Sequence, residues 1–573
     1  MKIALAQLNP TVGDIDGNGE KVIAAHAQAK AAGGDLVVLP ELFLTGYPPE
    51  DLVLRTAFQA AAHDKVQELA QTLSDGPGVL LGTIWQQGGE LYNAVVLLDR
   101  GKIEAVRFKV DLPNYGVFDE KRVFASGPLP GPVNFRDVRI GVPICEDIWN
   151  EEVTECLQES GAEFFLVPNG SPFDWKKPDL RTNIAVARVA ETDLALAYVN
   201  QVGGQDELVF DGASFVLNPD HSLACQLPQW SETIVVTEWH EQNGTWRCKP
   251  GDVAKLDDGD ASAYQGCMLG LRDYVHKNRF PGVVLGLSGG IDSALVAAIA
   301  TDALGADKVR CVMLPYRYTS EESLEDAAQC AKALSVPYEI VPIGEAVEGF
   351  HAVLGDMFAG SEPGITEENI QSRVRGTALM AISNKFGAMV VTTGNKSEMS
   401  VGYATLYGDM NGGFNPIKDL YKTEVFRIAA WRNAHVPKGG LGPSGTVIAN
   451  NILTKAPTAE LREDQKDADS LPPYDVLDDI LTGLVEEELA LADIVARGHE
   501  ADLVARIQHL LYISEYKRRQ AAPGVKISSR SFGRERRYPI TNRFRETAQK
   551  VEKSRPMADA PEQVLPSPDG GDM

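Results

Sequence analysis

Short apolar runs alternate with longer amphipathic stretches along the first 250 residues. Short runs of apolar and β-branched residues are typical of strands, and apolar residues at every third or fourth position are typical of helices. This pattern predicts strands at residues 2–8, 36–40, 79–85, 92–99, 138–143, 164–168 and 194–200. It predicts helices at residues 18–32, 52–73, 151–161 and 179–193. Turn signals at Gly88-Gly89 and Arg100-Gly101 add hairpins, which favours packed sheets with outer helices over a simple Rossmann sheet.

A polar, Asp- and Gly-rich stretch at residues 251–260 predicts a linker to a second part. Beyond it, a helix is predicted from Tyr264 onward. Strands at residues 281–287, 309–314, 338–342 and 389–393 then alternate with helices at 294–304, 321–333 and 366–386. This alternation predicts a doubly wound parallel sheet, with ligands at the carboxyl ends of its strands. We expect a domain at 1–250, a linker at 251–263, a domain at 264–545, with helices in 472–511, and a disordered tail at 546–573.

The composition narrows the class of protein. The chain has 573 residues, which suggests about three or four structural units. A net charge of -26 argues against nucleic acids and anionic membrane surfaces as partners. The sequence has neither an apolar run of the roughly 20 residues that span a bilayer nor a signal-peptide core near its start. Its seven cysteines show no metal-binding or disulfide spacing, so we expect a soluble protein of the reducing cytoplasm.

A glycine- and hydroxyl-rich loop joins a predicted buried strand to a predicted helix. It consists of Gly286, Leu287, Ser288, Gly289, Gly290, Ile291, Asp292 and Ser293. Backbone N–H groups and a helix N-terminus at such a loop favour phosphate binding. The loop lacks the lysine of a Walker motif, but Asp292 could hold a magnesium ion between phosphate oxygens. An ordinary strand-to-helix turn is the alternative. The ordered Ser-Gly-Gly-x-Asp-Ser set resembles the loop of the ATP pyrophosphatases, which cut ATP to AMP and pyrophosphate.

Three reactive residues of the first part each follow a predicted strand or a strand-like run: Glu41, Lys109 and Cys145. A thiolate can attack an amide, a carboxylate can move the proton, and an ammonium can stabilise the oxyanion. These residue types suffice for amide hydrolysis through a thioester. Taken singly, a cysteine is usually a buried apolar residue, and a Glu or Lys after a strand is usually solvated. Spacing alone leaves both interpretations open.

The surroundings of these residues resemble the nitrilase superfamily. They are Leu-Pro-Glu41-Leu, Lys109 ahead of Leu112-Pro-Asn-Tyr-Gly-Val-Phe-Asp-Glu120, and Ile-Cys145-Glu-Asp-Ile-Trp149. The resemblance implies an α-β-β-α sandwich. It also implies that Glu41 is the general base, Lys109 the oxyanion stabiliser and Cys145 the nucleophile.

A nitrilase-like domain joined to an ATP-pyrophosphatase loop resembles the glutamine-dependent NAD synthetases, in their shorter bacterial form. This resemblance implies that deamido-NAD, ATP, glutamine and water give NAD, AMP, diphosphate and glutamate through an NAD-adenylate. It implies a homo-oligomer, at least a dimer, and a Rossmann-like second domain of the adenine nucleotide alpha hydrolase type. We expect ammonia to pass internally between the two sites.

The resemblance also implies roles for residues at matching positions. Glutamine would contact Tyr115, Ser171 and Lys177; ATP would contact the loop 286–293, Thr393 and Lys422; deamido-NAD would contact Asn369, Arg373, Glu398, Asp409 and Lys517; magnesium would contact Asp292 and Glu398; and Lys418 would contact phosphate. Solvated side chains are the alternative for these lysines and carboxylates. The basic stretch from Lys517 to Arg545 could be a phosphate-binding lid or a solvated tail.

Two other functions remain possible at this stage. One is an amidotransferase of the same ATP-cutting class with another acceptor, although its glutaminase would usually carry an N-terminal Cys or a Cys-His-Glu triad. The other is a non-catalytic glutamine or nucleotide sensor, which would be expected to lose Cys145, Glu41 or residues of the 288–293 loop. All of these residues are present.

Overall fold

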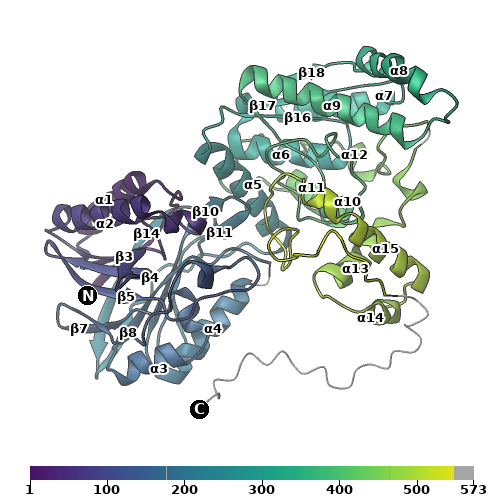
Figure 1. Ribbon diagram of the computed structural model, residues 1–573. Coiled ribbons are helices and arrows are strands. Elements are labelled where there is room, and N and C mark those ends of the chain that lie inside the picture. Colours follow the sequence, from purple (N-terminus) through teal and green to yellow (C-terminus); the bar gives the residue numbers. More distant parts are fainter. Residues whose placement is uncertain (176, 464, 547–573) are drawn as a thin grey trace.

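A computed structural model describes residues 1–175, 177–463 and 465–546. The first part of the chain lies at the lower left of Figure 1 and the second at the upper right. All of the predicted disordered tail except residue 546 lies outside the described residues. Within the described part, no helix is both long and apolar enough to cross a membrane.

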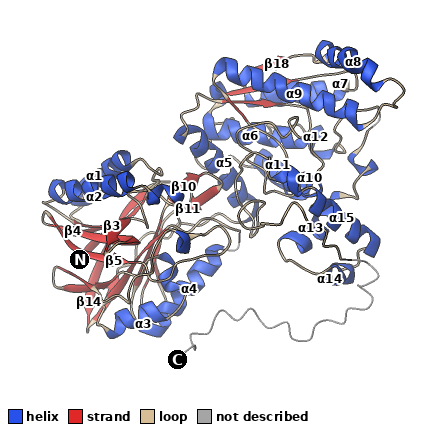
Figure 2. Cartoon of the chain, in the orientation of Figure 1, coloured by secondary structure: helices blue, strands red, loops and turns tan. Residues whose placement is uncertain are grey.

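The first part contains two large sheets, visible as crowded strands in Figure 2. One has the order β15 (Thr245–Cys248), β14 (Thr233–Gln242), β1 (Lys2–Gln7), β2 (Leu36–Val38), β3 (Gly78–Gln87), β4 (Glu90–Asp99), β5 (Lys102–Phe108). The other has the order β13 (Leu223–Gln226), β12 (Phe215–Leu217), β9 (Leu196–Asn200), β8 (Phe164–Asn169), β7 (Val138–Gly141), β6 (Val133–Phe135). Four helices flank them: α1 (Ile15–Ala31), α2 (Thr56–Thr72), α3 (Glu152–Glu159) and α4 (Lys177–Thr192).

Alternate residues of each strand enter different cores, as the two-residue period of a strand requires. Ile3 and Leu5 of β1 pack with Phe164 of β8 in the core between the sheets. Ala4 and Ala6 face the opposite way, into the core that α1 and α2 cover. Phe165 and Val167 of β8 likewise pack against α3 and α4. The predicted α-β-β-α sandwich is therefore confirmed.

The second part is built on a parallel sheet with the order β18 (Tyr338–Ile340), β17 (Val309–Met313), β16 (Val283–Gly286), β19 (Met389–Val390). One face packs against α5 (Gly259–Lys277), α6 (Ile291–Leu304), α7 (Glu321–Leu334) and α11 (Lys422–Ala434). The other packs against α8 (Gly344–Phe358) and α9 (Ile365–Phe386). Helices on both faces confirm the predicted doubly wound sheet.

Helix α5 begins at Gly259, earlier than predicted, and packs against the first part of the chain. Its neighbours there are the strands of a two-stranded sheet, β10 (Val202–Gln205) and β11 (Leu208–Asp211). Val202 and Val209 belong to the same hydrophobic core as α5 and α6. The Asp273 carboxylate of α5 accepts hydrogen bonds from the Asn9 side chain and the Gly204 N–H, both at 2.7 Å. The two parts therefore share a continuous core.

Small helices form a third cluster, at the lower right of Figure 1. It consists of α10 (Lys396–Val401), α13 (Tyr474–Val485), α14 (Leu491–Ala496) and α15 (Ala501–Ile513), with α12 (Asn450–Thr454) and α16 (Glu515–Arg518) nearby along the chain. The basic stretch follows it. The interpretation of this stretch as a solvated tail is wrong for Arg518, Lys526 and Arg536, because all three are buried.

Phe164→Ala tests the core between the two sheets. Phe164 is fully buried and stacks on Trp239, with the ring centroids 4.9 Å apart. Its truncation is expected to lower the free energy of unfolding of the first part by about 3–5 kcal/mol. Urea denaturation followed by tryptophan fluorescence measures this. Leu54→Ala, at a half-exposed position, should change it by less than about 0.5 kcal/mol, and equal effects would contradict the packing described.

Two candidate active sites

The first site is built on the turn that follows β7. Cys145 begins a short 3-10 helix (Cys145–Ile148) and has a φ of 48°, which is uncommon for a residue with a side chain. Its turn is held by the buried Asp147 carboxylate, which accepts hydrogen bonds from the N–H groups of Ile144 (2.9 Å), Val110 (2.9 Å) and Asp111 (2.8 Å). Burial raises the pKa of Asp147 to about 7. The turn is thereby tied to the chain just after Lys109.

Glu41 and Lys109 form a fully buried ion pair beside Cys145. The Lys109 Nζ lies 2.7 Å from Glu41 Oε1, and both side chains have no exposed surface. The Asn93 side chain donates to the same oxygen at 2.7 Å, and the Gly170 N–H donates to Glu41 Oε2 at 2.9 Å. These bonds hold the carboxylate in one orientation.

Glu120 is a third charged residue of this site, for which the sequence predicted no role. Both its oxygens accept hydrogen bonds from Lys109 Nζ, at 2.9 and 3.0 Å, and Tyr47 donates to it at 2.8 Å. Burial raises the pKa of Glu120, Lys109 lowers it and Glu41 raises it further. The sequence did contain a signal for Glu120, because this residue ends the stretch 112–120 that resembles the nitrilase superfamily.

Burial and these charges together shift the pKa of the thiol. Burial raises the pKa of Cys145 well above its usual value; Glu41 raises it further, and Lys109 opposes them. Burial also lowers the pKa of Lys109, but Glu120 and Glu41 outweigh it, so the lysine stays charged. The resting site thus combines a protonated thiol, a carboxylate and an ammonium. That set can carry out proton transfer and oxyanion stabilisation.

The three residues expected to contact glutamine lie on different segments. The Tyr115 hydroxyl donates to the carboxylate of Glu146, the residue after Cys145, at 2.7 Å, although the side chain is half exposed. Ser171 is buried next to Gly170, and its hydroxyl accepts a hydrogen bond from Arg181 at 3.1 Å. Lys177 begins α4, but its side chain lies outside the described residues.

The second site is a cavity of about 300 Å³ at the carboxyl end of β16. All eight residues of the loop 286–293 line it. Gly289 has a φ of +81°, and a Cβ there would lie 2.4 Å from the Ser323 carbonyl oxygen, so the close packing requires glycine. The N-terminus of α6 opens onto this loop, which favours anions.

One lysine joins two carboxylates at the cavity wall. Lys422 Nζ pairs with Asp292 and, at 3.1 Å, with Glu398. The Asn395 side chain donates to Asp292 Oδ1 at 2.8 Å. Burial and Asp292 raise the pKa of Glu398, against the lowering effect of Lys422. Burial lowers the pKa of Lys422, but its two carboxylates raise it well above its usual value.

The remaining predicted residues fall into two groups. Thr393 and Asp409 line the cavity. Three others contact a loop at its border: Asn369 accepts from the Thr405 hydroxyl (2.9 Å), Arg373 donates to the Leu406 carbonyl (3.2 Å) and Lys517 donates to the Gly402 and Ala404 carbonyls (both 2.7 Å).

Lys418 points away from the cavity border toward the first part of the chain, where its Nζ lies 3.1 Å from Glu207.

Several charged residues of the cavity were missed in the sequence. Arg375 lines it two residues beyond Arg373, and burial lowers the pKa of Arg375 to about 10. Lys455 and Glu460 line it from a loop, where Glu460 accepts from the Ser323 hydroxyl at 2.8 Å. The sequence of that loop, Lys-Ala-Pro-Thr-Ala-Glu-Leu (455–461), has neither the period of a helix nor that of a strand. Its charged residues therefore gave no indication that they line the cavity.

Two family models match the chain, one over each part. The carbon-nitrogen hydrolase model matches residues 2–247 and the NAD synthase model matches residues 263–521. The first match contains Glu41, Lys109 and Cys145, and the second contains the loop 286–293. These matches coincide with the two parts of the chain described above.

Whole proteins match over nearly the full chain. Glutamine-dependent NAD(+) synthetases from Rhodobacter capsulatus and Xanthomonas campestris are 52% and 47% identical, over 95% of this chain and 99% and 98% of theirs. The structure of the glutamine-dependent NAD+ synthetase from Acinetobacter baumannii in complex with ADP is similar, with a TM-score of 0.75 and 43% identity over 94% of this chain and 98% of that one. The chain belongs to the glutamine-dependent NAD(+) synthetase family.

Proposed function

We propose that this protein converts deamido-NAD, ATP, glutamine and water to NAD, AMP, diphosphate and glutamate in the cytoplasm. The observation that carries the proposal is the presence of two separate sites in one chain. One has a buried Glu41–Lys109 pair beside Cys145, and the other has a phosphate-binding loop with Lys422 at its wall. The described cysteines are all free thiols, which fits a reducing compartment.

At the first site, Cys145 attacks the amide carbon of glutamine. Glu41 takes the thiol proton and gives it to the departing ammonia, so that a C–S bond replaces the C–N bond. The Lys109 ammonium stabilises the oxyanion, and Glu120 keeps that ammonium charged and in place. Water, deprotonated by Glu41, then cleaves the thioester and releases glutamate. Tyr115, Ser171 and Lys177 bind the substrate around this centre.

At the second site, the nicotinate carboxylate of deamido-NAD attacks the α-phosphate of ATP and diphosphate leaves. The loop 286–293, Thr393 and Lys422 bind the phosphates and neutralise the charge that builds up. Ammonia from the first site, carried inside the protein, attacks the resulting acyl adenylate and displaces AMP. Deamido-NAD is bound by Asn369, Arg373, Glu398, Asp409 and Lys517, and the proposal includes Arg375 because it lines the cavity.

Asp292 and Glu398 fit a magnesium ion that accompanies ATP. Both carboxylates line the cavity at the phosphate-binding loop. Among the described residues, no cluster of three or more His, Cys, Asp or Glu side chains suits a metal. That fits Mg²⁺, which usually takes one or two carboxylates and completes its shell with phosphate oxygens and water. When bound, the ion would neutralise phosphate charge.

A homo-oligomer is proposed on the resemblance and on an apolar surface of α8 and α9. The exposed fractions of Val353 and Met357 are 81% and 80%, and Ile365 at the start of α9 is 72% exposed. Val347 is the buried residue of α8, so most of this apolar helix lacks a partner within the described chain. Apolar patches of this kind mark protein interfaces. A second copy of the chain is the proposed partner.

Cys145→Ala tests the division of labour between the sites. We expect glutamine-driven NAD synthesis to fall by about 10³-fold or more, because the nucleophile is lost. Synthesis from ammonium chloride should continue at the wild-type rate. AMP, NAD and glutamate are measured with and without deamido-NAD; loss of the ammonium-driven reaction, or AMP formation independent of deamido-NAD, would sink the proposal.

Removal of divalent cations tests the metal assignment. With excess EDTA, NAD synthesis from ammonium chloride should stop and should return when Mg²⁺ is added in excess, because the phosphates bound at the second site need the ion. Asp292→Asn should raise the Mg²⁺ concentration for half-maximal synthesis by about tenfold, the equivalent of about 1.4 kcal/mol. Ammonium-driven synthesis that continued in EDTA would contradict the assignment.

Charge on α8 tests the proposed interface. Val353→Glu with Met357→Glu places two carboxylates four residues apart on one helix face, and burying them between copies is costly. Sedimentation velocity should show a smaller species than for the wild type. Leu54→Glu, which charges an exposed apolar position in the first part, is the matched control and should leave the size unchanged. An unchanged oligomer in the double variant would exclude this surface.

A further inference from the structure

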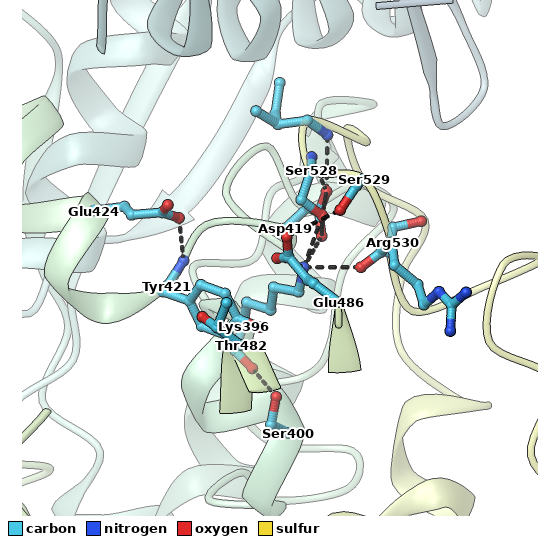
Figure 3. Close-up of polar contacts among 12 residues, drawn as sticks. Lys396, Ser400, Asp419, Tyr421, Glu424, Thr482, Glu486, Ser528, Ser529 and Arg530 are labelled. Atoms are coloured by element: carbon cyan, nitrogen blue, oxygen red, sulfur yellow. Dashed lines mark hydrogen bonds and ion pairs between the residues drawn. The ribbon is translucent and has the colours of Figure 1, made fainter. Parts of the chain in front are cut away.

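Lys396 is a fully buried lysine that the proposed reaction does not use, and Figure 3 shows its polar contacts. Its Nζ lies 2.9 Å from Asp419 and 2.8 Å from Glu486. It also donates to the Ser528 hydroxyl at 2.7 Å and to the Arg530 carbonyl at 2.9 Å. Burial lowers the pKa of Lys396, but Asp419 and Glu486 raise it well above its usual value. The buried charge therefore persists, and its partners must stay in place to compensate it.

On one side, Lys396 belongs to the helix that carries the metal-facing carboxylate. Asn395, the preceding residue, caps α10: its Oδ1 accepts from the Glu398 N–H at 3.0 Å. The Nδ2 of the same side chain donates to Asp292. Lys396 thus directly follows the residue that contacts Asp292 and caps the helix carrying Glu398.

On the other side, Lys396 holds the chain segment 525–530. The Asp419 carboxylate, which pairs with Lys396, accepts hydrogen bonds from the N–H groups of Ile527 (2.8 Å) and Ser528 (2.7 Å). The Ser528 hydroxyl also donates to Asp419, at 2.8 Å. The Ile527 carbonyl accepts a hydrogen bond from the Trp175 N–H, at 3.3 Å, in the first part of the chain.

The same segment contacts the loop that orients the general base. Lys526 Nζ lies 3.3 Å from Asp174, and the Lys526 N–H donates to the Glu207 carbonyl at 2.8 Å. Asp174 is four residues after Gly170, whose N–H holds Glu41. Direct contacts therefore run from Glu41 through loop 170–175, segment 525–530 and Lys396 to α10.

We propose that Lys396 is a positioning residue that couples glutamine hydrolysis to NAD formation, on the basis of the function proposed above. It holds segment 525–530 against α10 and, through that segment, loop 170–175. Such a contiguous network is a physical route for coupling, and it requires a direct test. When the contact of Lys396 with segment 525–530 is broken, loop 170–175 is no longer held to the second site. Glutamine is then hydrolysed without delivery of its ammonia.

Ser528→Ala is the decisive variant, because it removes one hydroxyl from this network and leaves the Lys396 ion pairs intact. Glutamate and NAD are measured with glutamine, and NAD is measured separately with ammonium chloride. We expect glutamate formed per NAD to rise at least about twofold, while the ammonium-driven kcat stays within about twofold of wild type, since one hydrogen bond is modest in net energy. Lys396→Met should raise the ratio further, to about fivefold or more, as a charged partner is lost.

Two controls separate coupling from a general loss of stability. Ser528→Thr keeps the hydroxyl and should restore the wild-type ratio. Thr301→Val removes another buried hydroxyl of the same part, which bonds the Ala297 carbonyl at 2.7 Å, and should leave the ratio unchanged. A wild-type ratio in Ser528→Ala, or a parallel fall of glutamine- and ammonium-driven synthesis, would overturn the inference. A wild-type protein that forms no NAD from either nitrogen source would overturn the proposed function instead.

Discussion

Buried lysines, each shared by two carboxylates, hold the reactive parts of this protein in place. A buried ammonium without partners is too costly for a folded protein, so its carboxylates must remain within hydrogen-bond distance. The groups are Lys109 with Glu41 and Glu120, Lys422 with Asp292 and Glu398, and Lys396 with Asp419 and Glu486. Because the partners come from distant segments, each group joins elements that the backbone alone would not bring together.

Two carboxylates against one ammonium also leave an excess of negative charge, and this excess suits each proposed reaction differently. Beside Cys145, burial and the Glu41 carboxylate raise the pKa of the thiol, which fits the proposed role of Glu41 as the base that takes the thiol proton. At the loop 286–293, Asp292 and Glu398 beside Lys422 are oxygen ligands of the kind that the proposed magnesium ion would take. The same arrangement of charges is therefore proposed to serve proton transfer in one place and phosphate binding in the other.

The two sites are held in one frame because the parts of the chain share a core around α5. Val202 and Val209 from the first part pack in the same cluster as Val525 and Ile527 from the C-terminal segment. That segment contacts loop 170–175 on one side and Lys396 of α10 on the other, and Lys526 within it is buried. Because the core is shared, the contact between Lys396 and Ser528 is proposed to affect glutamine hydrolysis at the first site.

Local sequence determined the fold class and the centre of each site. Strand periodicity located β8 almost to the residue, and the loop 286–293 and the surroundings of Cys145 are contiguous stretches that carry their own chemistry. Strand β10 was missed because its sequence, Val-Gly-Gly-Gln, has no apolar run, whereas β11 and α8 were missed although they are apolar. Only the tertiary structure placed Arg375 in the cavity and Arg373 at its border, or gave Lys109 a second carboxylate in Glu120. Short windows of sequence encode local conformation, whereas the side that a residue faces and the distant partner that it meets depend on how the whole chain packs.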